Sequence, residues 1–466
     1  MKRLLGIVKR FFANDYIFSV MAKIFGVGIG IIVGALTARY FGAELKGVIA
    51  VVQNDVSLYS IFIGLGISQA YPFFRKKEPT ILDEYLNNIS TLFVIYEVIA
   101  FAVAAWLYSL GNVYLGLAII LMPVAAYTKQ LNYIVLVENP RRRNISSIVI
   151  SISEIVILCV VWVVTDANEA IALGYYTATV LINLALSFIN LRMNPLRIRP
   201  ALRRIPSFVR FGFVPMLVYL CMSINYKIDI QMLKLFPNVS YAEIGIYSTG
   251  VGLAAKIWLV PDAIKDILLS RLIKGGKEEE VAQVLRINLA ICLFSTVMLA
   301  AVGKPLVGII YGEEFIDSYY VMLIMLVGVM GMIFYKMIYS YNISKGKRWV
   351  NLLFLGLAAL VNVAGNLFAI PKFGIWGAGI VSITSYMLCG ICFLIYFWRV
   401  SHISLVRLLF VQRADIEMVK KFFSAKDVKK KSAVLQKSDE GGVDAETTVA
   451  IGDTDKSEND GSLGEQ

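Results

Sequence analysis

The stretch KIFGVGIGIIVGALTARYFGAELKGVIAVV, residues 23–52, decides the class of fold because its apolar character extends far beyond what a soluble helix or strand requires. A membrane-spanning helix needs roughly 20 mostly apolar residues in one run. A basic start within residues 2–10 precedes this stretch, as in a signal peptide, but the apolar part is too long for a signal core and leads straight into more apolar sequence. We therefore predict a retained first spanning helix that is followed directly by a second.

Similar apolar runs recur along nearly the whole chain of 466 residues, of which 58% are hydrophobic and 17% are charged. An ordinary soluble domain is nearer half apolar and a quarter charged, so the composition indicates a membrane protein. Hydropathy windows of about 19 residues predict an all-α integral membrane protein with twelve transmembrane helices. The predicted spans lie near residues 16–38, 48–71, 86–109, 113–137, 146–165, 169–191, 207–235, 242–268, 284–303, 318–343, 350–371 and 374–398.

Lysine and arginine are distributed unevenly between alternate connections, and short basic loops are retained in the cytoplasm. The connections within residues 2–10, 75–77, 141–143, 192–210, 271–286 and 345–348 carry 23 of these residues. The intervening connections carry four, which are Arg39, Lys46, Lys304 and Lys372. We therefore predict that both termini are cytoplasmic. This topology, together with anionic lipid headgroups, also accounts for the net charge of +12, so we expect no nucleic-acid partner.

The long basic connection from Arg192 to Pro206 divides the predicted spans into six before and six after. We therefore predict an N-terminal lobe of residues 1–200 and a C-terminal lobe of residues 201–399. Residues 400–437 are basic and amphipathic in places, which is typical of a segment on the inner membrane surface. Residues 438–466 are too polar to bury a core, so we predict a disordered acidic tail.

A faint internal repeat supports the division into two lobes. YFGAELKGVIAVV, residues 40–52, and LFPNVSYAEIGIYSTG, residues 235–250, both combine an outer turn with a helix start led by a glycine, at Gly47 and Gly245. Both segments have the same direction through the membrane, which predicts parallel repeats related by an axis along the membrane normal. Chance similarity between two apolar hairpins is the alternative.

Five lysines lie within the predicted spans, and each would cost roughly 2.5–3.5 kcal/mol if it faced lipid at the bilayer centre. They are Lys23, Lys129, Lys227, Lys256 and Lys336. A water-filled cavity lined with ammonium groups attracts an anionic substrate, because a low-dielectric cleft concentrates opposite charge. We therefore predict that these lysines line a substrate cavity. The alternative is that some extend to the membrane surface or pair with acids.

Four acids also lie within the predicted spans, namely Asp55, Glu97, Glu154 and Asp229. A buried carboxylate near a lysine can change its charge during transport, which coupling to H⁺ or Na⁺ requires. We assign this ion-coupling role to Asp229, Glu154 and Glu97, whereas Asp55 lies closer to the outer surface. A static ion pair with one of the lysines is the alternative.

Glycine and proline mark positions at which the spans can bend. Gly26, Gly30 and Gly34 share one stripe of the first span, and Pro215 and Pro261 interrupt the backbone hydrogen bonds of the seventh and eighth. We predict that these five residues act as hinges during alternating access. Plain close packing of helices is the alternative for the glycines.

The chain contains one histidine, His402, just past the last predicted span. A histidine metal cluster and a Ser-His-Asp triad are therefore excluded, and we expect no cofactor, no metal and no catalytic residue. The longest outer connection, roughly Lys304 to Asp317, is short and lacks both His and Arg. This argues against a membrane polysaccharide polymerase, which generally presents a large outer loop with catalytic Arg or His.

Three stretches resemble polysaccharide exporters of the Wzx type, in the multidrug/oligosaccharidyl-lipid/polysaccharide (MOP) exporter superfamily. They are residues 23–52, quoted above, residues 226–236 (YKIDIQMLKLF) with 244–272 (IGIYSTGVGLAAKIWLVPDAIKDILLSRL), and residues 362–386 (NVAGNLFAIPKFGIWGAGIVSITSY). The resemblance extends from Met1 to about Val400 in order and spacing. The two extra spans of the lipid II flippase branch are not among the predicted ones, which disfavours a role in peptidoglycan synthesis.

The resemblance implies two six-helix lobes around a central cavity that opens alternately to each face. It implies a flippase that moves undecaprenyl-pyrophosphate-linked oligosaccharide repeat units across the bacterial cytoplasmic membrane, and not an enzyme. The surface polymer would be an O-antigen, a capsule or an exopolysaccharide. The expected partners are the anionic lipid-linked oligosaccharide, membrane lipids and the polysaccharide polymerase machinery. A multidrug or metabolite antiporter of the same superfamily is the main alternative.

Overall fold

The computed structural model describes residues 15–192 and 199–417, and every regular element within these ranges is a helix. Ten helices in this part of the chain are long and apolar enough to cross a membrane. The predicted all-α membrane fold is therefore confirmed. The predicted acidic tail, residues 438–466, and most of the predicted basic segment lie outside the described residues.

The helices follow the predicted spans closely. Their bounds are α2 Asp15–Ile63, α3 Ile67–Lys77, α4 Ile81–Ser109, α5 Val113–Glu138, α6 Pro140–Val164, α7 Glu169–Leu191, α8 Ile205–Leu233, α9 Tyr241–Ala254, α10 Leu259–Ile273, α11 Glu278–Tyr311, α12 Asp317–Ser344, α13 Arg348–Ser401 and α14 Leu405–Leu409. Two short 3₁₀ turns, η2 Ala255–Trp258 and η3 Glu313–Phe315, complete the described elements.

Two of the helices each contain two spans. Helix α2 has 49 residues and α13 has 54, whereas a bilayer needs roughly 20. Each has one non-helical residue, Gly42 (φ 69°) or Gly374 (φ 53°), at a backbone conformation that favours glycine. Each helix is thereby divided into two segments of span length, and the ten helices supply the twelve predicted spans.

Two predicted spans differ in detail from the observed helices. The span predicted at 48–71 ends at Ile63, because the chain turns at Gly64–Gly66 and then starts the separate helix α3. The span predicted at 242–268 is interrupted by the 3₁₀ turn η2 between α9 and α10. A hydropathy window averages over both breaks, so it reports one continuous span in each case.

The connections between helices lie at two faces, because successive spans run in opposite directions. One face, here called the basic face, carries the connections that follow α3, α5, α7, α10 and α12. The other, here called the opposite face, carries the kinks at Gly42 and Gly374 and the connections that follow α4, α6, α8 and α11. The arginine- and lysine-rich connections of the sequence are those of the basic face.

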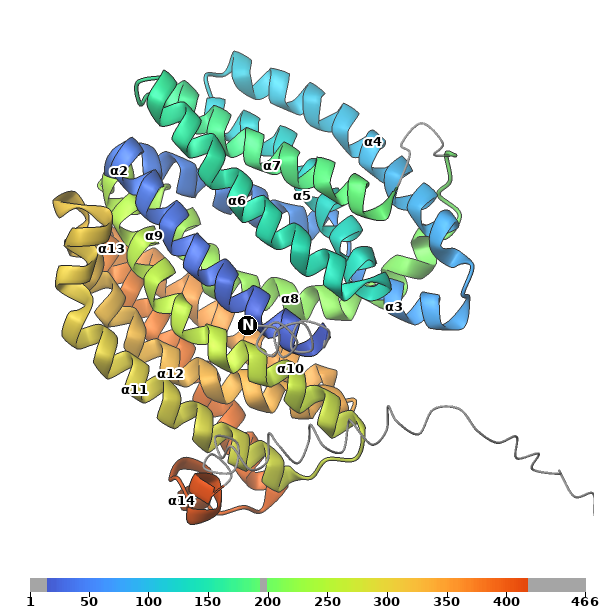
Figure 1. The fold of residues 1–466 in the computed structure, drawn as a ribbon, viewed down its shortest axis with the longest axis vertical. Helices are drawn as coiled ribbons and strands as arrows, with labels where there is room; N and C mark the ends of the chain where they lie inside the picture. Colours follow the sequence, from blue (N-terminus) through green and yellow to red (C-terminus); the bar gives the residue numbers. More distant parts are fainter. Residues whose placement is uncertain (1–14, 193–198, 418–466) are drawn as a thin grey trace, which may run out of the picture. The chain divides into compact units, whose positions relative to one another are not determined.

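Following the predicted division of the chain, α2–α7 are here called the first lobe and α8–α13 the second lobe. Figure 1 shows α4–α7 on one side and α10–α13 on the other, with α2, α8 and α9 between them. Helix α12 forms the centre of the second lobe and has an almost fully buried middle, which includes Met332, Ile333 and Met337.

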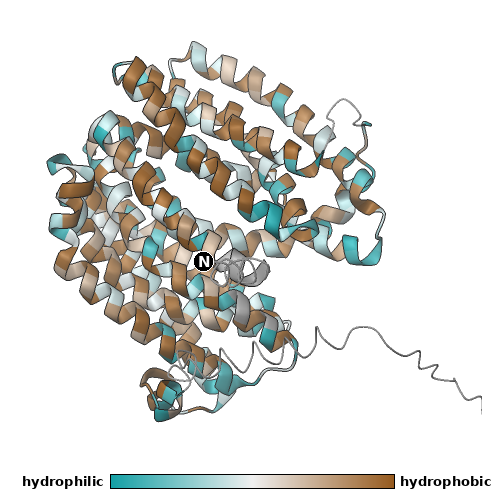
Figure 2. Cartoon of the chain, viewed as in Figure 1, coloured by the Kyte–Doolittle hydropathy of each residue, from teal (hydrophilic) through white to brown (hydrophobic). Residues whose placement is uncertain are grey.

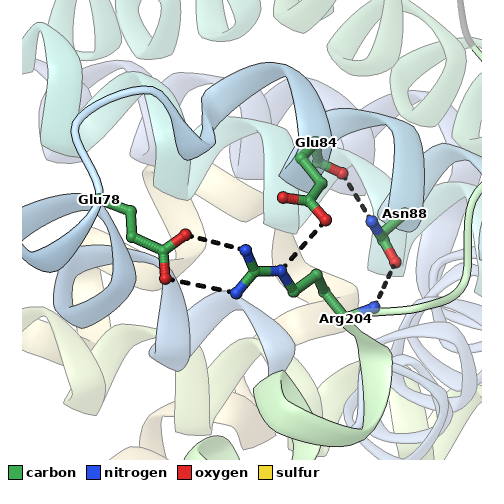
Figure 3. A network of polar contacts seen from close by, with 4 residues as sticks. All are labelled: Glu78, Glu84, Asn88 and Arg204. Atoms are coloured by element: carbon green, nitrogen blue, oxygen red, sulfur yellow. Dashed lines mark hydrogen bonds and ion pairs between the residues drawn. The ribbon is translucent and has the colours of Figure 1, made fainter.

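The connection between the lobes is bound to α4 (Figure 3). The backbone N–H groups of Arg199, Ala201 and Arg204 donate to side chains on one face of this helix, at 2.9–3.2 Å. The Arg204 guanidinium bonds Glu84 at 3.1 Å and both oxygens of Glu78. These hydrogen bonds raise the pKa of Arg204. The residue that precedes α8, and thus the second lobe, is fixed to the first lobe.

Apolar side chains face outward on both lobes, and Figure 2 shows brown residues along the outer helices, with teal ones more frequent at helix ends. Val163, Phe368 and Ile309 are 85%, 76% and 73% exposed. Apolar surface on this scale is unfavourable in water. It indicates that the outer faces of the helices contact lipid.

Candidate substrate cavity

A cavity of about 830 Å³ lies between the two lobes and is open rather than enclosed. The first lobe contributes residues of α2, α5, α6 and α7, and the second lobe contributes residues of α8 and α9. Its lining is rich in hydroxyl and amide side chains, which are Thr37, Gln53, Asn54, Ser57, Ser60, Thr128, Asn132, Thr179, Asn183 and Ser248. These groups both donate and accept hydrogen bonds.

Two of the predicted cavity lysines line this cavity, and each contacts the other lobe. The Nζ of Lys129, on α5, lies 3.9 Å from the ring centroid of Tyr219, on α8. The Nζ of Lys227, on α8, donates to the Oγ of Ser57, on α2. The two ammonium groups therefore lie where the lobes face each other.

The other three predicted lysines are not part of the lining. Lys256 lies in η2, with its Nζ 3.4 Å from the position of a β-carbon on the lining residue Gly30. Lys336 is buried and bonds Asp262 at 2.5 Å. Lys23 is half-buried on α2. The structure therefore brings Lys129 and Lys227 together and places Lys336 in an ion pair.

Two basic residues of the lining were not among the predicted ones. Lys46 and Arg143 were assigned to connections, but they lie in the first turns of the second segment of α2 and of α6, and both line the cavity. Lys46 donates to the carbonyl of Gly34 at 3.2 Å. The lining thus contains four basic side chains and one carboxylate, that of Glu154.

The predicted ion-coupling residues lie in three different environments. Glu154 lines the cavity on α6. Asp229 is buried within the second lobe, where it accepts hydrogen bonds from Tyr247 (2.8 Å), Asn366 (2.9 Å) and Ser382 (2.5 Å). These donors come from α9 and from both segments of α13, so Asp229 connects three parts of this lobe.

Glu97 lies on α4, outside the cavity lining. Its Oε2 is buried and has no hydrogen-bond partner among the described residues. Because α4 is an outer helix of the first lobe, Glu97 is separate from both Glu154 and Asp229. The three predicted residues therefore do not form one cluster.

Of the predicted hinge residues, two line the cavity and one lies beside a break between helices. Gly30 and Gly34 are lining residues, and α2 stays helical through them and through Gly26. Pro215 lies inside α8, and Pro261 lies in the first turn of α10, directly after η2. The one non-helical residue of α2 is Gly42, at the opposite face.

The lobes meet at the opposite face through the two glycines of the predicted repeat. A β-carbon on Gly47 would lie 1.8 Å from the carbonyl oxygen of Tyr241, and one on Gly245 would lie 2.1 Å from that of Ala43. Two equivalent positions make such a reciprocal contact when they lie beside the axis that relates the repeats. No other residue type fits this contact.

An ion pair reinforces this closure. The Nζ of Lys234, which follows α8, donates to both carboxylate oxygens of Asp55, on α2, at 2.7 Å. At the other end, the cavity reaches Arg143 in the first turn of α6, at the basic face. The lobes are therefore in close contact at the opposite face, and the lining of the cavity extends to Arg143 at the basic face.

A polar cavity between two six-helix lobes, which meet at one membrane face, gives this protein the fold of a membrane transporter. In the described part of the chain, no three His, Cys, Asp or Glu side chains gather to hold a metal ion. Residues 12–258 match the family of polysaccharide biosynthesis proteins. Since this match includes more than half of the chain, the protein belongs to that family.

Solved structures of the MOP superfamily share the fold. The chain is similar to the lipid II flippase MurJ in an inward closed conformation, with a TM-score of 0.65 and 15% identity over 84% of this chain and 91% of that one. It is similar to an inward-facing multidrug resistance MATE transporter, with a TM-score of 0.62 and 14% identity over 83% and 98%. A comparison with curated protein sequences finds no match.

A third structure with this fold is a MOP superfamily transporter from Pyrococcus furiosus, described as having a binding pocket of reverse polarity. Its TM-score is 0.56, with 14% identity over 83% of this chain and 95% of that one. These three structures are described as those of a flippase and two transporters, and this chain shares their fold.

Proposed function

We propose that the protein flips undecaprenyl-pyrophosphate-linked oligosaccharide repeat units from the inner to the outer leaflet of the bacterial cytoplasmic membrane, for surface polysaccharide synthesis. The lipid would stay in the bilayer while the pyrophosphate and the glycan cross through the cavity by alternating access. Lys129 and Lys227 are assigned to the pyrophosphate, with Lys46 and Arg143 as further cations of the same cavity.

The observation that carries this proposal is the charge of the cavity, which has four basic side chains against one carboxylate. Cations in a low-dielectric cleft raise the local concentration of an anion such as pyrophosphate. The surrounding hydroxyl and amide groups suit sugar hydroxyls, which need both donors and acceptors. Lys23 and Lys256 remain candidates for substrate contact in another conformation, because neither lines the cavity in this one.

Coupling to H⁺ or Na⁺ is the second part of the proposal. Asp229 is fully buried, and no basic side chain of the described residues pairs with it. Asn366 Oδ1, beside this carboxylate, is buried without a hydrogen-bond partner in the same part of the chain. A carboxylate oxygen and an amide oxygen are suitable ligands for Na⁺, and the carboxylate can take up a proton. Glu154, which faces the cavity, is the second candidate.

The proposed orientation places the basic face in the cytoplasm. It is supported by the 23 basic residues of the predicted connections on that side, against four on the other, to which the observed end of α8 adds Lys234. In this orientation the cavity of the structure opens to the cytoplasm, where lipid-linked repeat units are assembled. A reporter fused after residue 417 would be inaccessible from outside the cell if this orientation is correct.

The main test is a deletion strain that is complemented with wild type, Lys129→Gln or Lys227→Gln. We expect lipid-linked repeat units to accumulate on the inner leaflet in the deletion strain and in both variants. Lys304→Gln is the matched control, because Lys304 lies outside the cavity and bonds Tyr320 at 3.1 Å. Normal delivery of repeat units to the outer leaflet in the deletion strain would contradict the proposal.

A multidrug or metabolite antiporter is the second candidate function. Four tyrosines and Glu154 line the cavity and suit an organic cation. The basic side chains oppose such a substrate by charge repulsion. If the deletion strain makes normal polymer but becomes sensitive to cationic drugs, the antiporter replaces the flippase. A change in polymer length alone would favour a polymerase.

A further inference from the structure

Two helix ends, one from each lobe, lie close to each other at the opposite face. In the first lobe, Gly42 interrupts α2, so a new helical segment begins at Ala43. In the second lobe, α11 ends at Tyr311 and is followed by Gly312 with φ 102°. A helix that begins leaves N–H groups without partners, and a helix that ends leaves carbonyl groups without partners.

Arg39, from the first lobe, caps the end of α11 in the second. Its Nε donates to the carbonyl oxygen of Ile310 at 3.0 Å, and its Nη2 donates to that of Ile309. Both carbonyls belong to the last turn of α11. A cation at this position also interacts favourably with the negative end of the helix dipole.

Glu314, from the second lobe, caps the start of the helical segment in the first. Its Oε1 accepts a hydrogen bond from the backbone N–H of Ala43 at 3.1 Å. Its Oε2 lies 3.4 Å from the position that a β-carbon on Gly42 would occupy. A carboxylate at a helix N-terminus satisfies an N–H group and interacts favourably with the positive end of the dipole.

We infer that Arg39 and Glu314 position the gate at the opposite face by reciprocal capping, in which each lobe supplies the cap for a helix end of the other. Both caps exist when the opposite face is closed, and both are released when it opens. Both side chains are exposed to solvent in the structure, so water can replace each cap as the lobes separate. The inference does not depend on which substrate the cavity carries.

Reciprocal capping differs in a testable way from an ordinary ion pair between the two residues. An ion pair tolerates exchange of its charges, as in the double variant R39E/E314R. Reciprocal caps do not, because the exchange places an anion against the carbonyls of α11 and a cation against the N–H of Ala43. We therefore expect the exchanged variant to open the face at least as much as either single substitution.

The experiment measures the side from which a cavity cysteine is labelled. Ser248→Cys, in the cavity lining, is introduced into a chain without its native cysteines and reacted with a membrane-impermeant maleimide from each side of oriented vesicles. The parent should react mainly from the basic face, with a low rate of labelling from the opposite face. The native cysteines, all free, are Cys159, Cys221, Cys292, Cys389 and Cys392.

Arg39→Ala and Glu314→Ala should each increase labelling from the opposite face by about fivefold, the population change expected from loss of one typical helix cap. Arg39→Lys and Glu314→Gln each keep part of a cap and should give smaller increases in labelling. These graded effects distinguish the loss of a cap from misfolding. Lys304→Ala, on α11 but outside both caps, should leave labelling unchanged. The inference would be overturned if neither alanine variant were labelled more from the opposite face than the parent is. It would also be overturned if R39E/E314R were labelled like the parent.

Discussion

Removal of Lys234 should open the opposite face far more than removal of its partner Asp55. The two side chains form an ion pair between the lobes at 2.7 Å, but the Asp55 side chain is 1% exposed and that of Lys234 is 19% exposed. In Lys234→Ala, a buried carboxylate loses its cation, which costs about 3 kcal/mol or more. Separation of the lobes hydrates this carboxylate, so the closed state should become about 100-fold less favoured relative to the open one.

Asp55→Asn provides the matched comparison. It leaves an ammonium group on a flexible stem, which can move towards water. We expect a cost of about 1 kcal/mol, or roughly fivefold in population. The double variant Asp55→Asn/Lys234→Ala contains neither charge and should resemble Asp55→Asn. If both side chains of the pair were well hydrated, removal of either one would instead cost less than about 1 kcal/mol, and the two single variants would have equal effects.

The assay is the distance between spin labels at Leu110 and Leu235, which are exposed at the opposite face and belong to different lobes. The parent should give one short distance, and Lys234→Ala should give predominantly a longer one. If Lys234→Ala opens the face no more than Asp55→Asn does, the asymmetry of burial does not control this gate, and the reasoning is refuted.

Three further predictions follow from the packing of the lobes. Gly47→Val or Gly245→Val should prevent closure of the opposite face and abolish transport, because a β-carbon at either position would lie within 2.1 Å of a backbone oxygen; the same spin labels measure this. Arg204→Ala should lower stability by about 1 kcal/mol, because its ion pairs with Glu78 and Glu84 are partly exposed; thermal unfolding in detergent at two salt concentrations measures this. Asp229→Ala should lower stability by about 2–4 kcal/mol, because it leaves buried donors without their acceptor; the same unfolding assay measures this, with Asp229→Asn as the milder control.

The fold could be predicted from the sequence because every membrane-spanning helix needs a minimum length. An apolar run of that length seldom occurs in any other kind of structure. The glycines at 42 and 374 could not be identified as the break points in this way. A hydropathy window averages over about 19 residues and does not locate a single residue with positive φ. The repeat did point to Gly47 and Gly245, which are now seen in contact.

The residues that line the cavity were harder to predict from the sequence. A hydropathy window assigns charged residues to connections, because it ends a predicted span where charges begin. Lys46 and Arg143 lie in helical first turns but were assigned to connections for that reason. The pairing of Lys336 with Asp262 depends on a contact between different helices, α12 and α10, which no local pattern reports. One sequence therefore locates charges within spans, but it does not distinguish a lysine that faces the cavity from one that is paired.

The polar character of the closed face fits a protein that must change between two states of similar free energy. An apolar interface would favour closure by about 25 cal/mol for each Å² removed from water, and opening would lose all of it. Ion pairs and helix caps lose far less, because water replaces each partner when the lobes separate. Asp55–Lys234 and the caps of Arg39 and Glu314 therefore give the closed face a defined geometry at a small net free energy. Since a substrate can shift an equilibrium only by its differential affinity for the two states, a gate closed in this way remains within the range that substrate binding can reverse.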